Sequence, residues 1–102
     1  MIMILSDGGT AVIRIQKHLD IRDEEYFVYF TAFAAAGRFG SGSVIVGDGT
    51  ERSLHSVLRQ NKVTAVIDAV CEPASEVSKA AMCVCKDRIP YVKYVNMEED
   101  YN

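Results

Sequence analysis

The sequence predicts an α/β fold in which helices cover both faces of a five-stranded, mainly parallel sheet. Two observations lead to this prediction. Short apolar runs typical of strands alternate along the chain with segments of helical periodicity, and several of these runs are apolar throughout. Strands that alternate with helices form parallel sheets through right-handed crossovers. The pattern is that of a Rossmann-like domain.

The expected strands are short and rich in aliphatic, aromatic or β-branched residues. They cover residues 1–5, 26–31, 43–46, 64–68 and 91–95. The helices expected between them cover residues 11–19, 50–61 and 74–87, and residues 32–42 form a glycine-containing loop. We therefore expect one nucleotide-binding domain over residues 1–96, followed by an acidic tail over residues 97–102.

Composition excludes several classes of protein. The chain has 102 residues, which suggests a single domain. Its net charge is -3 and it has no dense run of Lys and Arg, so we expect no nucleic-acid partner. No stretch approaches the roughly 20 apolar residues that span a bilayer. The apolar residues 1–5 lack the basic flank of a signal peptide, and we expect a cytoplasmic protein without a membrane anchor.

Cysteine and histidine placement predicts no metal site. An odd number of cysteines, Cys71, Cys83 and Cys85, does not make a complete disulfide framework, and their spacing does not suit zinc. We interpret Cys83 and Cys85 as helix residues that pack as small hydrophobes. His18 and His55 fall on different predicted helices, where we expect them to be solvated.

The turn after the first strand is the strongest candidate for a ligand site. Ligands of open parallel sheets bind outside the carboxyl ends of the strands, where the strand order reverses. Gly8 and Gly9 let the backbone approach a phosphate without a Cβ clash, and Thr10 adds a hydroxyl at the start of a helix. The turn is short and is not a full G-x-G-x-x-G fingerprint. A tight turn without a ligand is the alternative interpretation.

Three further polar residues follow strands or helix starts. Asp68 ends an otherwise apolar strand, where its carboxylate either bonds a ligand hydroxyl or caps the following segment. Arg14 lies one helical turn after Thr10, within reach of a phosphate or on the solvated face. Arg38 lies in the loop after the second strand, where an arginine can accommodate a ribose 2′-phosphate. A surface loop position without a ligand is the alternative for Arg38.

These residues, in this order, resemble the precorrin-6A (cobalt-precorrin-6A) reductases of corrin biosynthesis. That family opens with a strand, G-G-T and an Arg four residues later, as in Gly8-Gly9-Thr10 and Arg14. Its third strand ends in V-G, as do Val46-Gly47, and its I-P-Y-L-R resembles Ile89-Pro-Tyr-Val-Lys93. Its D-A-T-H-P-F-A-A-E-I-S segment is similar to residues 68–78, with matches at Asp68, Ala69, Ala74, Glu76 and Ser78.

The resemblance implies an oxidoreductase that uses NADPH to reduce a C=C bond of a tetrapyrrole during cobalamin biosynthesis. The residues it assigns to the cofactor lie after successive strands: Gly8, Gly9 and Thr10 at the pyrophosphate, Thr31 and Arg38 at the adenosine end, and Gly47 and Asp68 at the ribose or nicotinamide. It assigns Cys71, Glu72 and Pro73 to a loop near the substrate. It identifies no catalytic residue.

Departures from the family bear on activity. Val12 replaces an acidic residue of the family, and Val70-Cys71-Glu72 stands where the family has T-H-P. The resemblance covers nearly the whole chain but about half of the family's length. A second half would come from a second copy of the chain or from a separate subunit, and the isolated chain is expected to have little activity.

Two other functions agree with the same pattern. One is a non-catalytic nucleotide-binding or regulatory module of the same fold. The other is a receiver-like signalling domain, which needs an acidic pair after strand one, a phospho-acceptor Asp after strand three and a Lys after strand five. Asp7, Asp48 and Lys93 imitate this set loosely, and Gly8-Gly9-Thr10 does not fit it.

Overall fold

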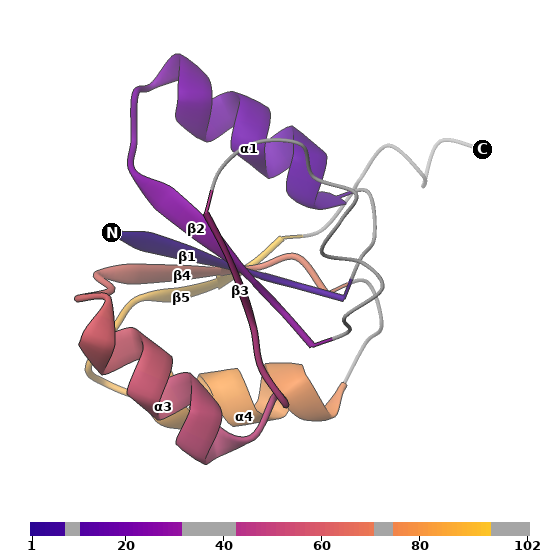
Figure 1. Ribbon diagram of the computed structural model, residues 1–102, viewed down its shortest axis with the longest axis vertical. Helices are drawn as coiled ribbons and strands as arrows, with labels where there is room; N and C mark the ends of the chain where they lie inside the picture. Colours follow the sequence, from indigo (N-terminus) through magenta and orange to yellow (C-terminus); the bar gives the residue numbers. More distant parts are fainter. Residues whose placement is uncertain (8–10, 32–42, 71–74, 95–102) are drawn as a thin grey trace.

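Five parallel strands form the centre of the protein (Figure 1). The computed structural model describes residues 1–7, 11–31, 43–70 and 75–94. Its strands are β1 (Ile2–Ser6), β2 (Tyr26–Phe30), β3 (Ser43–Val46), β4 (Ala65–Asp68) and β5 (Tyr91–Lys93), in the order β3-β2-β1-β4-β5. Its helices are α1 (Ala11–Ile21), α3 (Glu51–Gln60) and α4 (Glu76–Cys85). The predicted Rossmann-like α/β fold is confirmed, and every strand pair is parallel.

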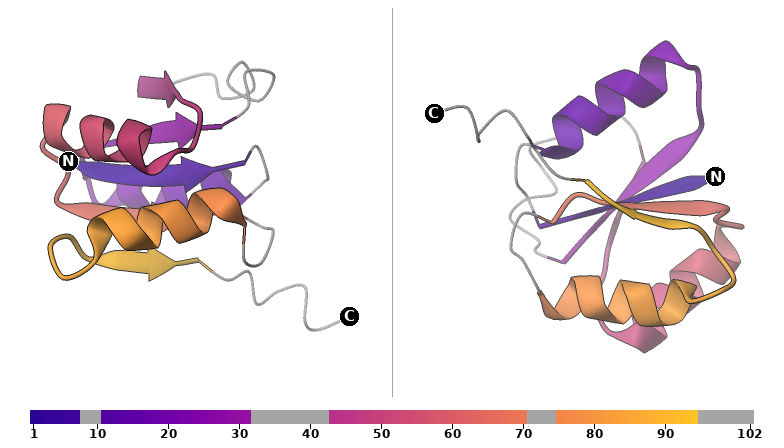
Figure 2. Two further views of the ribbon diagram at one scale, coloured as in Figure 1. Left: turned by 90° about the horizontal axis from the view of Figure 1, so that it is seen from below. Right: turned by 180° about the vertical axis from the view of Figure 1, so that it is seen from behind.

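The three described helices lie on both faces of the sheet. Figures 1 and 2 show α1 on one face and α3 with α4 on the other. Alternate residues of β1 divide between these two layers: Met3 and Leu5 pack in the cluster beneath α3 and α4, whereas Ile4 packs against α1. All three are fully buried, which explains why this strand is apolar throughout.

Side-chain caps set the starts of two helices. Thr50 accepts a hydrogen bond from the Ser53 amide at 3.2 Å, and Ser75 accepts one from the Ser78 amide at 3.1 Å. Because Ser75 is the cap, α4 begins at Glu76 rather than at residue 74 as expected. The helix ends at Cys85, two residues before its expected end, and Asp87 then adopts a φ of 59°.

His18 and His55 are exposed, as expected. Cys85 is buried as expected, but Cys83 is exposed, so the interpretation of both cysteines as packed hydrophobes is wrong for Cys83. Over the described residues, no three His, Cys, Asp or Glu side chains lie close enough to hold a metal. The helices of the described ranges are too short, or too polar, to cross a membrane. The loop over residues 32–42 and the tail over residues 97–102 fall outside the described residues.

Candidate functional site

The strand order reverses at the carboxyl ends of β1 and β4. The chain crosses from β1 to β2 over one face, and later elements return to add β4 and β5 on the other side of β1. Leu5 is paired with Asp68, and the Ala69 amide donates to the Leu5 carbonyl at 2.8 Å. In open α/β sheets this reversal opens the crevice that receives ligands. The candidate site is therefore this edge, which we call the carboxyl edge of β1 and β4.

The predicted phosphate turn joins this edge to α1. β1 ends at Ser6 and α1 begins at Ala11, so the segment between them leads from the reversal point into a helix N-terminus. Gly8, Gly9 and Thr10 themselves lie outside the described residues, as do Arg38, Cys71, Glu72 and Pro73. The assignments of these seven residues stay predictions. Thr31, Gly47 and Asp68 lie within the described ranges.

The first turn of α1 is suited to an anion. It contains no acidic side chain, whereas α3 and α4 carry Glu51 and Glu76 in their first turns. The partial positive charge at the start of α1 is therefore not neutralised by a carboxylate of its own first turn. Val12, which replaces the acidic residue of the resembled family, is fully buried in the cluster beneath α1. Its position belongs to the core and offers nothing polar to a ligand.

Asp68 is the centre of a buried polar network. Its side chain is fully buried, and one carboxylate oxygen accepts from the Val70 amide at 2.9 Å. The same oxygen lies 3.3 Å from the Lys93 ammonium, and the other oxygen accepts from the Tyr91 hydroxyl. Lys93 also donates to the Val70 carbonyl at 2.8 Å and to the Ser78 hydroxyl at 3.3 Å. These contacts link β4, β5 and α4.

These contacts give Asp68 a structural role. Its carboxylate already has a charged partner and two hydrogen-bond donors, as a buried carboxylate requires. The sequence pattern indicated Asp68 as a candidate but did not indicate Tyr91, Lys93 or Ser78 as its partners. Lys93 has one local signal, because it ends β5 as Asp68 ends the neighbouring β4. Tyr91 begins β5 and Ser78 lies in α4, and neither position marks them as partners of Asp68.

The contribution of this network to stability depends on pH at high pH, because Tyr91 is ionisable. Burial, and then the hydrogen bond to Asp68, raise the pKa of its hydroxyl well above the ordinary value of about 10. An unfolded chain releases this proton near pH 10, whereas the folded chain retains it. The stability that neutral Tyr91 contributes is therefore complete below pH ~10 and is lost as the pH rises towards the folded-state pKa.

We expect the wild-type chain to be more stable than Tyr91→Phe at neutral pH and to lose this advantage above pH ~10. Thermal unfolding of both proteins between pH 7 and pH ~11 measures the difference. The difference in stability between the two proteins at each pH cancels the contributions of the other tyrosines and of the lysines. Parallel pH profiles for the two proteins would show that the folded chain does not keep Tyr91 neutral above pH ~10.

Gly47 has a structural reason to be glycine. A Cβ built there would lie 2.1 Å from the Tyr29 hydroxyl oxygen and 2.7 Å from the Ser53 hydroxyl oxygen. The Tyr29 hydroxyl forms a hydrogen bond of 2.7 Å with Ser53 and accepts another from the Gly49 amide at 3.0 Å. The space beside Gly47 is thus filled by Tyr29, a fully buried residue of β2. No local pattern in the sequence indicates this contact.

Thr31 contacts the same loop. Gly49 adopts a φ of 76°, and a Cβ built on it would lie 3.2 Å from the Thr31 methyl and 3.3 Å from a Val77 methyl. The loop between β3 and α3 therefore passes between the end of β2 and the side of α4. Thr31 and Gly47 meet around this loop, whereas Asp68 belongs to a separate network with β5 and α4. The three described residues do not form one cluster.

The carboxylate of Asp48, in the same loop, is hydrogen-bonded to Thr50. It accepts from the Thr50 amide at 3.0 Å and from the Thr50 hydroxyl at 2.7 Å. These hydrogen bonds lower the pKa of Asp48. β3 and β5 are the opposite edge strands of the sheet, so Asp48 and Lys93 cannot meet in one phospho-acceptor site. Receiver domains have the strand order 2-1-3-4-5, which this sheet does not have.

Comparison with known proteins gives no family. No family model matches the chain, and no curated protein matches it. The chemistry of the site consequently has to be argued from the fold and from the residues at the carboxyl edge of β1 and β4.

Proposed function

We propose that the chain binds a dinucleotide, NADPH, at the carboxyl edge of β1 and β4, as the cofactor-binding half of a reductase similar to the precorrin-6A reductases. The observation that carries the proposal is the strand order β3-β2-β1-β4-β5. It sets the β1–α1 connection, with its sequence Gly8-Gly9-Thr10, beside the point where strand order reverses. The absence of an acidic residue from the first turn of α1 supports an anionic ligand there.

In this proposal the chain holds the cofactor and the cofactor supplies a hydride. Backbone amides at the start of α1 and the Thr10 hydroxyl hold the pyrophosphate. Arg38 pairs with the 2′-phosphate and Thr31 lies towards the adenosine end. Gly47 and Asp68 act indirectly, because their described contacts keep the ends of β3 and β4 in place. The tetrapyrrole substrate would lie against the loop that contains Cys71, Glu72 and Pro73.

A non-catalytic nucleotide-binding module is the second candidate, and Val70 favours it. Where the resembled family has a threonine hydroxyl, Val70 is an apolar side chain that is 2% exposed and packs beneath α3 and α4. Its backbone carbonyl accepts a hydrogen bond from the Lys93 ammonium. Both candidates predict NADPH binding and little turnover by the isolated chain. They differ once a second half is supplied by another chain, so oxidation of NADPH in the presence of a tetrapyrrole is measured at several protein concentrations.

The binding step is tested with Gly9→Val. A β-branched side chain in the turn should block the close approach of a pyrophosphate to the backbone, and we expect NADPH to bind at least about tenfold more weakly, or not at all. Isothermal titration measures the affinity, and circular dichroism verifies that the fold persists.

Ser43→Val is the matched control. Ser43 is exposed at the amino end of β3, and the substitution adds the same side chain away from the carboxyl edge. It should leave NADPH affinity unchanged. Equal affinity in the wild-type chain and in Gly9→Val would show that the turn does not contact the cofactor.

A further inference from the structure

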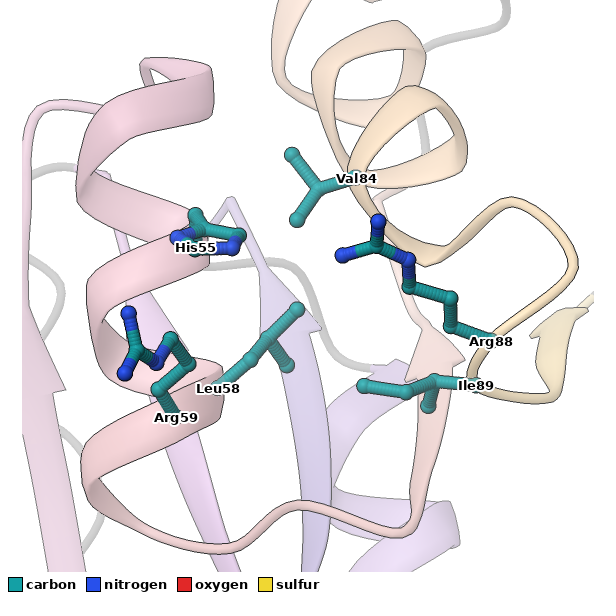
Figure 3. A pocket seen from close by; sticks show the side chains of 6 residues that line it. All are labelled: His55, Leu58, Arg59, Val84, Arg88 and Ile89. Carbon is teal, nitrogen blue, oxygen red and sulfur yellow. The ribbon is translucent and has the colours of Figure 1, made fainter.

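A second surface has a composition unlike the rest of this acidic protein. A groove of about 340 Å³ lies between α3 and the end of α4, lined by His55, Leu58, Arg59, Val84, Arg88 and Ile89. Figure 3 shows Leu58, Val84 and Ile89 pointing towards one another, with the Arg88 guanidinium extending towards α3. Neighbouring hollows on the same helices add Arg52 and Lys86, with Glu51 as the one acidic residue. We call this surface the basic groove.

Among the described residues, the arginines of the basic groove have no counter-ion. Arg52, Arg59 and Arg88 are exposed, and within the described ranges they form no ion pair. An apolar floor with unpaired guanidinium groups at its rim is the composition of a binding surface rather than of a solvated helix face. It favours a partner that offers carboxylates around an apolar side chain.

The chain itself carries a surface of that kind. The end of α1 and the turn that leads to β2 carry four exposed carboxylates, Asp20, Asp23, Glu24 and Glu25, against the single Arg22. The Asp20 carboxylate accepts a hydrogen bond from the Tyr26 hydroxyl at 2.9 Å. Ile21, the last residue of α1, is 83% exposed within this run. The backbone of the turn is fixed by the Glu24 amide, which donates to the Leu19 carbonyl at 2.9 Å. We call residues 20–25 the acidic turn.

A chain cannot place its acidic turn in its own basic groove. α1 covers one face of the sheet, and α3 with α4 cover the other (Figure 1). A contact between the two surfaces therefore requires two molecules. Both surfaces lie towards the amino ends of the strands, since the acidic turn precedes β2 and Arg88 precedes β5. Their contact would leave the carboxyl edge of β1 and β4 open to a ligand.

We propose that two copies of this chain associate by docking the acidic turn of one, with Ile21 at its centre, into the basic groove of the other. Ile21 packs on Leu58, Val84 and Ile89, and carboxylates of the turn pair with Arg59 and Arg88. The charges on the two surfaces are opposite, which steers the encounter and fixes the orientation of the contact. The association is independent of NADPH and goes beyond the proposed cofactor site.

Sedimentation equilibrium over concentrations up to ~1 mM tests the proposal, a range that detects weak complexes. The average mass of the wild-type chain should rise above the 11.3 kDa of the monomer. Ile21→Ser, Arg88→Glu and Glu24→Arg should each weaken the association at least tenfold, and higher salt should weaken it in the wild type. Lys79→Glu, a charge reversal on α4 outside the groove, should not.

A mixture of Arg88→Glu and Glu24→Arg provides the decisive comparison. In the mixture the intact turn of Arg88→Glu can dock into the intact groove of Glu24→Arg, and the reversed turn faces the reversed groove. The mixture should therefore associate more strongly than either variant alone. A wild-type mass that stays at 11.3 kDa at every concentration would overturn the proposal. So would association that Arg88→Glu and Glu24→Arg leave unchanged, or a mixture that shows no recovery.

Discussion

Asp68→Ala is expected to lower the free energy of unfolding by about 3 kcal/mol or more, because removal of one partner from a buried charged pair typically costs 3–5 kcal/mol. The substitution leaves the Val70 amide and the Tyr91 hydroxyl without their acceptor and removes the counter-charge of Lys93. Lys93 is 35% exposed and can be rehydrated, which places the expected loss towards the lower end of the range. Urea unfolding followed by circular dichroism measures it.

Asp48→Ala is the matched control for this experiment. Asp48 also follows a strand at the carboxyl edge, but its side chain is exposed and its partner is the nearby Thr50. Its loss should destabilise the protein much less than the loss of Asp68, as expected for an exposed capping residue. If Asp68→Ala were no more destabilising than Asp48→Ala, Asp68 would be free for a ligand rather than committed to the core network.

Gly47→Ala is expected to lower the free energy of unfolding by about 3–5 kcal/mol. The added Cβ would overlap the Tyr29 hydroxyl oxygen and lie 2.5 Å from the ring carbon that bears it. Overpacking of this kind costs roughly 1–3 kcal/mol, and displacement of Tyr29 also breaks its hydrogen bonds with Ser53 and Gly49, each worth about 1 kcal/mol.

A double-mutant cycle with Tyr29→Phe identifies the cause. Removing the hydroxyl takes away the atom nearest to the new Cβ, so Gly47→Ala should cost less in the Tyr29→Phe background than in the wild type. Equal costs in the two backgrounds would mean that Tyr29 does not determine the residue at position 47. A ligand contact would then be the better explanation for this glycine.

Much of the fold could be predicted because the signals for it are local. The central strands β1 and β2 are short runs of mostly buried side chains, and each described helix has an apolar face of its own, as at Leu54 and Leu58 of α3. The order of the strands is not a local signal. The same alternation of strands and helices is compatible with the receiver-like order, and only the side on which each crossover returns distinguishes the two.

The polar networks could not be predicted, for the same reason. Asp68 and Tyr91 are 23 residues apart, and Tyr29 and Ser53 are 24 apart. No periodicity connects residues at that separation, and their contacts exist only once the sheet has formed. The resemblance to the precorrin-6A reductases assigns Gly47 and Asp68 to the cofactor. Their described contacts are with the protein itself.

NADPH titration followed by amide NMR shifts of the wild-type chain shows whether the cofactor binds at the carboxyl edge, because the shifted amides locate it. We predict the largest shifts at the carboxyl edge, at Ser6, Asp7, Ala11, Thr31 and Ala69, with little change along the basic groove. Saturation should occur at one NADPH per chain. The account would be contradicted if the carboxyl edge stayed unchanged, or if the shifts gathered around Arg59 and Arg88, where any polyanion could bind.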